Sequence, residues 1–223
     1  MCIRDSAGRA WSRLRRSPAT RGPPRRSRAP SADSTGLQLF GQGEWDAQKH
    51  GRTRRQWRKL HLGVDVGTGE IAAHVLTEGH ADDPAQAPGL LEQAEGSVAT
   101  VNADGAYDSE AVYQAATRQH GPSSDVVIPP RASAVPSTDD LAAQTPRDRH
   151  IQLIAKQGRM AWQQVSGYGR RSLVETAIGR YKHLIGPKLR ARTLPGQQGE
   201  AALAVATLTR MIRTAKPVSV RRT

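Results

Sequence analysis

The stretch from Tyr168 to Lys182 constrains the fold of this 223-residue chain more than any other. From Leu173 onward its apolar residues recur every three or four positions, which predicts a helix with one buried side. Gly186 and Pro187 predict where that helix ends, because Gly suits the position just past a helix and Pro cannot continue one. The predicted buried stripe consists of Leu173, Val174, Ala177, Ile178, Tyr181, Leu184 and Ile185.

A second face of the predicted helix carries charge. At about 100° per residue, Arg171, Glu175 and Lys182 fall in one sector beside the apolar stripe. The rules of helix periodicity and capping alone leave two interpretations of Glu175 open. In the first, Ser172 begins a capping box and Glu175 reaches back to the N-cap amide. In the second, Glu175 belongs to a charged site together with Arg171 and Lys182.

The spacing of four residues in this stretch resembles a known signature. Tyr168, Arg171, Glu175 and Lys182 stand in the pattern Y-x2-R-x3-E-x6-K. This pattern is similar to that of a large group of insertion-sequence transposases with a DDE active site. The resemblance implies a DNA transposase that cleaves DNA and transfers the freed strand. It also implies two aspartates upstream, each at the end of a strand.

Two segments match the aspartate motifs that the resemblance implies. They are Ala32-Asp33-Ser-Thr-Gly-Leu and Val101-Asn-Ala-Asp104-Gly-Ala-Tyr-Asp108. The resemblance then implies that Asp33, Asp104 and Glu175 are catalytic and ligate two Mg²⁺ (or Mn²⁺) ions, with Asp33 as the bridging ligand. Carboxylates suit this role because hard divalent cations prefer oxygen ligands, and a pair of such ions activates water and stabilises charge on phosphate.

The resemblance also implies how DNA is held. Arg171 and Lys182 would bind a DNA phosphate or the cleaved end, and Tyr168 would pack on the nucleic acid or hydrogen-bond to it. The implied partners are the ends of the insertion sequence and the target DNA, with the protein acting as a homodimer on DNA.

The order of the predicted elements indicates an α/β fold, and the resemblance implies the same: a ribonuclease H-like mixed sheet flanked by helices. A Gly-rich turn at Gly67–Glu70 lies between two apolar runs and predicts a hairpin. Asp65 in that hairpin is a competing acid, but a polar residue beside a turn explains it better. The sequence predicts strands at 60–66, 71–76, 98–103 and 125–128, helices at 82–96, 109–120, 145–164, 172–185 and 197–214, a flexible insertion at 131–146, and burial of Leu203, Val205, Leu208 and Met211 by the last helix.

Composition restricts the class of protein. A formal net charge of +13 indicates a polyanionic partner such as nucleic acid. The single Cys2 excludes an internal disulfide, and no apolar run approaches the roughly 18 residues that a membrane helix needs. We therefore expect a bacterial cytoplasmic protein associated with the nucleoid. Two other classes stay open: a catalytically dead remnant that still binds DNA, and a basic RNA-binding structural protein, which leaves the acids unexplained.

Residues 1–31 differ from the rest of the chain. They are rich in Arg, hold the single acid Asp5 and have no hydrophobic period, which predicts a disordered basic segment. This segment is either an arm on DNA phosphates or a non-native leader of an N-terminally truncated gene. The resemblance implies a hydrophobic strand before Asp33, yet residues 28–32 lack Val, Ile and Leu and include Pro30. We expect a damaged first strand, Asp33 as the least well placed acid, a catalytic domain at 32–215 and a basic tail at 216–223.

A dense basic run with one aromatic residue spans positions 49–59. In a protein of this charge it predicts contact with the DNA backbone, with the aromatic ring stacking on a base or anchoring the loop. The alternative is a solvated loop. The candidate DNA-binding residues of this run are Arg52, Arg54, Arg55, Trp57, Arg58 and Lys59.

Overall fold

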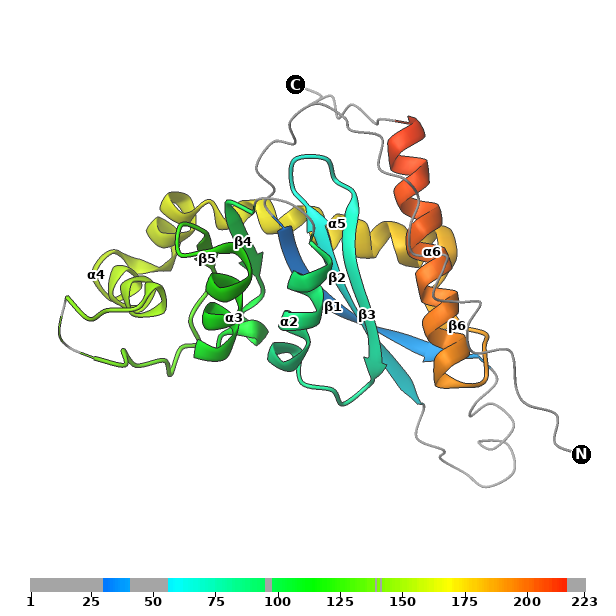
Figure 1. The fold of residues 1–223 in the computed structure, drawn as a ribbon, viewed down its shortest axis with the longest axis horizontal. Helices are drawn as coiled ribbons and strands as arrows, with labels where there is room; N and C mark the ends of the chain where they lie inside the picture. Colours follow the sequence, from blue (N-terminus) through cyan, green and yellow to red (C-terminus); the bar gives the residue numbers. More distant parts are fainter. Residues whose placement is uncertain (1–29, 41–55, 95–97, 139, 141, 216–223) are drawn as a thin grey trace, which may run out of the picture.

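A six-stranded mixed sheet forms the centre of the molecule (Figure 1). The structure is a computed structural model that describes residues 30–40, 56–94, 98–138, 140 and 142–215. The strands lie in the order β3-β2-β1-β4-β5, and the short β6 pairs with the far end of β1. Their bounds are β1 Pro30–Leu39, β2 Trp57–Asp65, β3 Ile71–Glu78, β4 Thr100–Ala103, β5 Asp125–Val127 and β6 Lys188–Leu189.

The first strand is intact, so the expectation of a damaged strand is wrong. β1 pairs antiparallel with β2 from Pro30 opposite Asp65 to Gln38 opposite Trp57, and parallel with β4 at Ser31 and Ala32. Pro30 is tolerated because it is the first residue of the strand, where a missing N–H is least harmful. Pro30 and Ser31, assigned from sequence to a disordered segment, therefore belong to the sheet. The rest of that predicted segment, and the predicted tail at 216–223, lie outside the described residues.

Helices cover both faces of the sheet (Figure 1). On one face α5 and α6 pack against Leu60, Leu62 and Val64 of β2, which are fully buried. On the other face α2 and α3 pack against each other and against the strands, around Val101 and Val112. The molecule therefore has the ribonuclease H-like α/β fold that was predicted. The bounds are α2 Asp83–Gln93, α3 Glu110–His120, α4 Pro146–Ser166, α5 Ser172–Arg180 and α6 Leu194–Ala215.

The predicted hairpin is confirmed. β2 and β3 pair antiparallel, and the turn between them lies at residues 66–70. Asp65 ends β2, and its Oδ1 accepts a hydrogen bond from the Gly67 amide at 2.9 Å. The side chain thus closes the turn, as the sequence favoured, on the strand neighbouring the one that carries Asp33.

The helix predicted from Thr145 begins as expected but is not continuous. Thr145 and Asp148 form a reciprocal capping box at the start of α4. Burial alone would raise the pKa of Asp148, but hydrogen bonds from Ser137 and Thr145 outweigh it and hold that pKa at about 2. Gly158 has a φ of 83°, which lies outside the helical region and divides α4 into two helices at a kink. The bond to Ser137 also ties the predicted insertion to α4.

The helix of the Tyr168–Lys182 stretch has three parts. A 3₁₀ turn at Tyr168–Arg171 leads into α5, and a π-helical turn at Tyr181–Ile185 follows. Gly186, with a φ of 119°, ends the helix as predicted. The wider π turn takes an extra residue, so the last apolar side chains rotate away from the core. Val174, Ala177 and Tyr181 are buried, whereas Leu173, Leu184 and Ile185 are 37%, 52% and 41% exposed, contrary to the prediction.

The last helix also departs from the prediction in part. Val205 and Leu208 of α6 are buried in the core, but Leu203 and Met211 are exposed. The predicted set spanned more of the helix circumference than one packed face covers, so its outer members face solvent. No helix in the described part of the chain is both long and apolar enough to span a bilayer.

Candidate active site

Three carboxylates from distant parts of the chain meet at one end of β4. Asp33 lies within β1, Asp104 directly follows β4, and Glu175 lies in the first turn of α5. Ala32 and Ala103 are register partners of the parallel pair β1 and β4, so the aspartates that follow them emerge side by side. The expectation that Asp33 ends its strand is wrong, because β1 continues to Leu39.

The guanidinium group of Arg171 joins the three acids. Its Nη2 lies 2.8 Å from Asp33 Oδ2 and 3.6 Å from Asp104 Oδ2, and its Nη1 lies 2.7 Å from Glu175 Oε1. We call Asp33, Asp104, Glu175 and Arg171 the acid cluster. Glu175 thus bonds to Arg171 and not to an N-cap amide. Ser172 itself has helical φ and ψ, so the capping-box interpretation is wrong.

Each aspartate of the cluster is oriented by the amide that follows it. Asp33 Oδ1 accepts from the Ser34 amide at 2.7 Å, and Asp104 Oδ1 accepts from the Gly105 amide at 2.6 Å. In both residues this leaves Oδ2 directed at Arg171. The aspartates are therefore fixed by backbone groups and do not depend on long flexible side chains for their orientation.

Burial differs across the acid cluster. The side chain of Asp33 is 12% exposed, that of Asp104 41% and that of Glu175 55%. Burial raises the pKa of Asp33, while the Ser34 amide and the charge of Arg171 oppose that rise. Asp33 is therefore the most enclosed of the three acids, and it is paired with Arg171 at 2.8 Å. The expectation that it would be the least well placed is wrong.

Two aromatic residues pack in series next to Arg171. The centroid of the Tyr168 ring lies 5.9 Å from the Arg171 Cζ, and the ring of Trp162 lies 5.3 Å from that of Tyr168. Trp162 is fully buried, and burial raises the pKa of Tyr168. An open groove adjoins this side of the cluster, lined by Met160, Gln163, Gln164, Gly167, Tyr168, Gly169, Arg170, Arg171, Ser172 and Glu175.

The remaining candidate residues are not gathered at the cluster. Lys182 lies in the π turn after α5, and its side chain makes no hydrogen bond or ion pair within the described residues. Trp57 is 42% exposed, and its ring lies against Gly36 of β1, where an added Cβ would stand 3.1 Å from Trp57 Cε3. This contact favours anchoring. Arg52, Arg54 and Arg55 lie outside the described residues.

Arg58 and Lys59 belong to β2 and are paired within the fold. Arg58 Nη1 lies 2.7 Å from Glu78 Oε2, and its Nε donates to Gln197 Oε1 at 2.8 Å. Lys59 Nζ lies 2.8 Å from Asp83 Oδ2. These contacts join β2 to β3, α6 and α2. The sequence did not predict them, because charge density in a run does not reveal where its partners lie.

A buried polar group behind Asp104 was also missed from sequence. Tyr107, in the 3₁₀ turn that follows Asp104, places its hydroxyl 3.1 Å from His61 Nδ1. His61 Nδ1 also lies 3.3 Å from Asp83 Oδ1, and its Nε2 lies 3.1 Å from Thr77 Oγ1. The alternation of β2 carries a signal for this, because Leu60 and Leu62 face α5 and α6, which turns His61 toward α2.

A second missed contact fixes the helix after Asp104. The buried Asp108 accepts hydrogen bonds from Arg147 Nε at 2.7 Å and Nη2 at 3.0 Å, and a third from the Arg131 amide. Asp108 precedes α3, and its carboxylate ties α4 to the turn beside the acid cluster.

The chemistry of the cluster fits hard divalent cations. Its ligand atoms are carboxylate oxygens, which Mg²⁺ and Mn²⁺ prefer. The oxygens converge on the guanidinium group of Arg171 and not on one another. Accordingly no group of three His, Cys, Asp or Glu side chains within the described ranges is arranged to hold a metal ion. The donor set therefore suits the ions, provided that Arg171 gives up its contacts.

A ribonuclease H-like sheet that brings carboxylates from β1, from the end of β4 and from α5 to one point defines a class of proteins that act on nucleic acid. Comparison with known proteins makes the class specific. The family model described as transposase DDE domain matches residues 27–210, so the chain belongs to this family of DDE transposases. DDE transposases generally use divalent metal ions.

One solved structure that is similar is the cryo-EM structure of the piggyBac transposase synaptic complex with hairpin DNA. The sequences are 9% identical, with a TM-score of 0.41, over 87% of this chain and 49% of that one. The chain thus spans about half the length of the piggyBac protein in that complex.

Proposed function

We propose that this protein is a DNA transposase that cleaves the ends of an insertion sequence and transfers the freed strands by a metal-dependent DDE mechanism. The observation that carries the proposal is the meeting of Asp33, Asp104 and Glu175 around one guanidinium group, on a fold that belongs to a transposase family. Neither a purely structural ion pair nor a general affinity for nucleic acid requires three acids at one point.

Asp33, Asp104 and Glu175 are the residues that would hold two Mg²⁺ or Mn²⁺ ions. When bound, such ions supply an activated water and stabilise charge on the phosphate oxygens. Asp33 is suited to a shared position because it is the most buried acid and its neighbours fix its orientation. Glu175 is suited to complete the site because its longer side chain extends from a helix and not from the sheet.

The other residues of the site would hold the DNA. Arg171 and Lys182 would bind a phosphate or the cleaved end, and Tyr168 would pack against the nucleic acid along the adjoining groove. In the first reaction, water attacks the phosphate at the element's end, and the leaving strand keeps a 3′-hydroxyl. In the second, that hydroxyl attacks a phosphate of the target DNA and forms a new phosphodiester bond, while the bond to the target strand's own 3′-oxygen breaks and that oxygen leaves as a 3′-hydroxyl. A covalent intermediate on Tyr168 is unnecessary, because water and the 3′-hydroxyl are the nucleophiles.

The proposed partners are the element ends and the target DNA, and a net charge of +13 suits binding to both. The protein would act on them as a homodimer, in the bacterial cytoplasm and in association with the nucleoid. Arg52, Arg54 and Arg55 remain proposed contacts to the DNA backbone. We assign Arg58 and Lys59 to the fold, because each is already paired with a carboxylate of this chain.

The alternative function is a remnant that binds DNA without cutting it. One ground for it was the expected damage to the first strand. β1 is formed over ten residues and Asp33 makes its ion pair with Arg171, so that ground is removed. The choice between the two functions then rests on activity.

The proposal is tested by nicking of a plasmid that carries the gene with its flanking DNA. With Mg²⁺ or Mn²⁺ the protein should nick this plasmid, and Asp104→Asn or Glu175→Gln should reduce nicking below detection. Both variants should bind DNA as well as the wild type or better, because each removes negative charge beside phosphate. Asp65→Asn is the matched control, since Asp65 is a buried acid on the adjacent strand, and it should still nick.

Two outcomes would contradict the proposal in different ways. If the wild-type protein binds DNA but never cuts it with either ion, the remnant function stands. If it cuts, and the Asp104 and Glu175 variants cut equally well, then the family holds but the assigned acids are wrong.

A further inference from the structure

We propose that Arg171 is an internal counter-ion of the acid cluster that competes with divalent cations, and that a DNA phosphate relieves this competition by taking Arg171 for itself. DNA binding and metal binding would then be coupled through one side chain. The inference rests on the proposed function, because it concerns regulation of the same site.

The first argument is geometric. Arg171 contacts Asp33 Oδ2 at 2.8 Å and Glu175 Oε1 at 2.7 Å, and it lies 3.6 Å from Asp104 Oδ2. With the other oxygen of each aspartate bonded to a backbone amide, these are the oxygens that face the centre of the cluster. The guanidinium group therefore occupies the space between these oxygens in which a divalent cation would have to bind.

The second argument is electrostatic. Three carboxylates with like charge repel each other, and a guanidinium group among them offsets part of that repulsion. Arg171 therefore stabilises the gathered arrangement of the acids. A divalent cation supplies the same stabilisation with twice the charge, but it is repelled by Arg171 as long as that side chain stays. The two cations are alternatives at this point in the fold.

The third argument concerns the hydrogen bonds that Arg171 does not make. Its Nε is buried and has no hydrogen-bond partner among the described residues. The guanidinium group thus uses its outer nitrogens on the acids while one donor is unsatisfied. A phosphate accepts two parallel N–H bonds from an arginine, including one from Nε, and so offers what the cluster does not.

The groove beside the cluster gives such a phosphate an approach. Its lining includes the 3₁₀ turn that carries Arg171, the end of α4 and Glu175. A phosphate that binds there would draw Arg171 away from the acids and add its own negative charge. Both effects raise the affinity for a divalent cation. By linkage, the cation must raise the affinity for DNA by the same factor.

The test measures Mn²⁺ binding to the full chain by titration, with the free ion detected by electron paramagnetic resonance. The titration is done on ice, with and without a short DNA duplex of mixed sequence. A titration of the DNA alone is subtracted, and the duplex is checked for cleavage afterwards. Without DNA, Arg171→Gln should bind Mn²⁺ about ten-fold more tightly than the wild type, within the usual range of coupling between sites. The duplex should tighten Mn²⁺ binding by the wild type about ten-fold, and that of Arg171→Gln by much less.

Arg180→Gln is the matched control. Arg180 lies on the same helix, and the structure gives it no ion pair within the described residues, so its variant should follow the wild type in both titrations. Equal or weaker Mn²⁺ binding by Arg171→Gln would overturn the inference. An affinity of the wild type for Mn²⁺ that is the same with and without DNA would also overturn it. This second measurement uses the wild type alone, so it tests the inference even if the Arg171→Gln variant fails to fold. Absence of Mn²⁺ binding in every arm would instead overturn the proposed function.

Discussion

Replacing His61 should flatten the dependence of folding stability on pH. His61 is fully buried at the middle of β2. Tyr107 and Asp83 face its Nδ1, Thr77 faces its Nε2, and the charge of Lys59 acts on it through the electrostatic field. Since Tyr107 belongs to the turn that follows Asp104, this perturbation also tests how firmly the sheet supports the acid cluster.

The size of the effect follows from the protonation of the imidazole. Burial lowers the pKa of His61 to about 4 from 6.5; the carboxylate of Asp83 opposes this and Lys59 adds to it. Between pH 6.5 and pH 4 the unfolded chain binds a proton at His61 that the folded chain does not. The free energy of unfolding therefore carries no penalty from His61 above pH 6.5, and it decreases as the pH falls from 6.5 toward 4. Each pKa unit corresponds to about 1.4 kcal/mol, so the loss amounts to about 3 kcal/mol.

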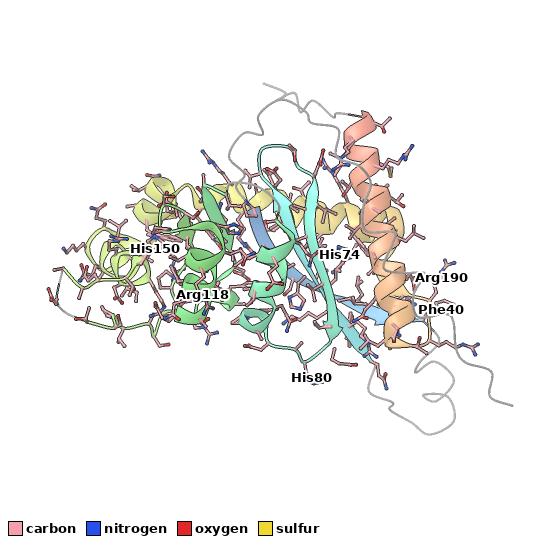
Figure 2. The ribbon with its side chains drawn as sticks, in the orientation of Figure 1. Phe40, His74, His80, Arg118, His150 and Arg190 are labelled. Carbon is pink, nitrogen blue, oxygen red and sulfur yellow. The ribbon has the colours of Figure 1, made fainter. Side chains whose placement is uncertain are left out.

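The assay is urea unfolding at a series of pH values from 7 to 4. His61→Gln keeps a side chain that can bond to the Tyr107 hydroxyl but cannot take up a proton. The variant should be less stable at pH 7, yet it should lose about 3 kcal/mol less than the wild type on going to pH 4. His80→Gln is the control, because His80 is exposed in the turn after β3 and its variant should follow the wild type (Figure 2).

The comparison must be between variant and wild type, because other histidines act in the same direction. Burial also lowers the pKa of His74 and of His150, so both will contribute to the loss of stability in acid in every protein tested. Parallel curves for His61→Gln and the wild type would refute the reasoning. They would mean that His61 is protonated in the folded state near its ordinary pKa, with Asp83 as its counter-ion.

Two further predictions follow from other ion pairs. Arg147→Ala removes the ion-pair partner of the fully buried Asp108 carboxylate and should destabilise the fold by about 3–5 kcal/mol in urea unfolding. Arg213→Ala breaks an exposed ion pair with Glu70 and should change the free energy of unfolding by less than about 1 kcal/mol. Equal effects of the two variants would argue against a structural role for the Asp108 pair. Arg171→Ala should weaken DNA binding and reduce the slope of log K against log salt by about 0.9, measured by fluorescence anisotropy, because one fewer phosphate is neutralised; an unchanged slope would remove Arg171 from the DNA contacts.

The elements that could be predicted from sequence are those whose signal is local. The hairpin around Gly67–Glu70, the start of α4 at Thr145 and the helix end at Gly186 each depend on neighbouring residues, and each is confirmed. Where the prediction failed, the deciding contact was distant. Leu203 and Met211 have the spacing of buried residues, but a residue's burial depends on which face of its helix the sheet covers.

The site shows the same division. Tyr168, Arg171 and Glu175 were found because they are close in sequence, and the aspartates were found through a resemblance that supplied their motifs. The resemblance implied that the three acids meet, but their contacts with Arg171 could not be predicted, since those depend on the parallel pairing of β1 with β4 and on the placement of α5. Nor could the ion pairs of Arg58 and Lys59 or the hydrogen bond from Arg58 to Gln197, whose partners lie on three other elements.

The prediction for β1 was wrong because it took the lack of apolar residues before Asp33 as a sign of a damaged strand. A central strand is held by its neighbours: β1 pairs with β2 along one edge, and its two ends pair with β4 and β6 on the other, whatever its side chains. Its polar half, Ser31–Thr35, is the part that carries Asp33 to the acid cluster, while Leu37 and Leu39 enter the core further along. A wholly apolar strand would satisfy the core but could not present a carboxylate beside Asp104. The departure from the expected pattern therefore falls at the acid cluster, where the proposed chemistry needs polar residues, and local rules commonly fail at functional positions.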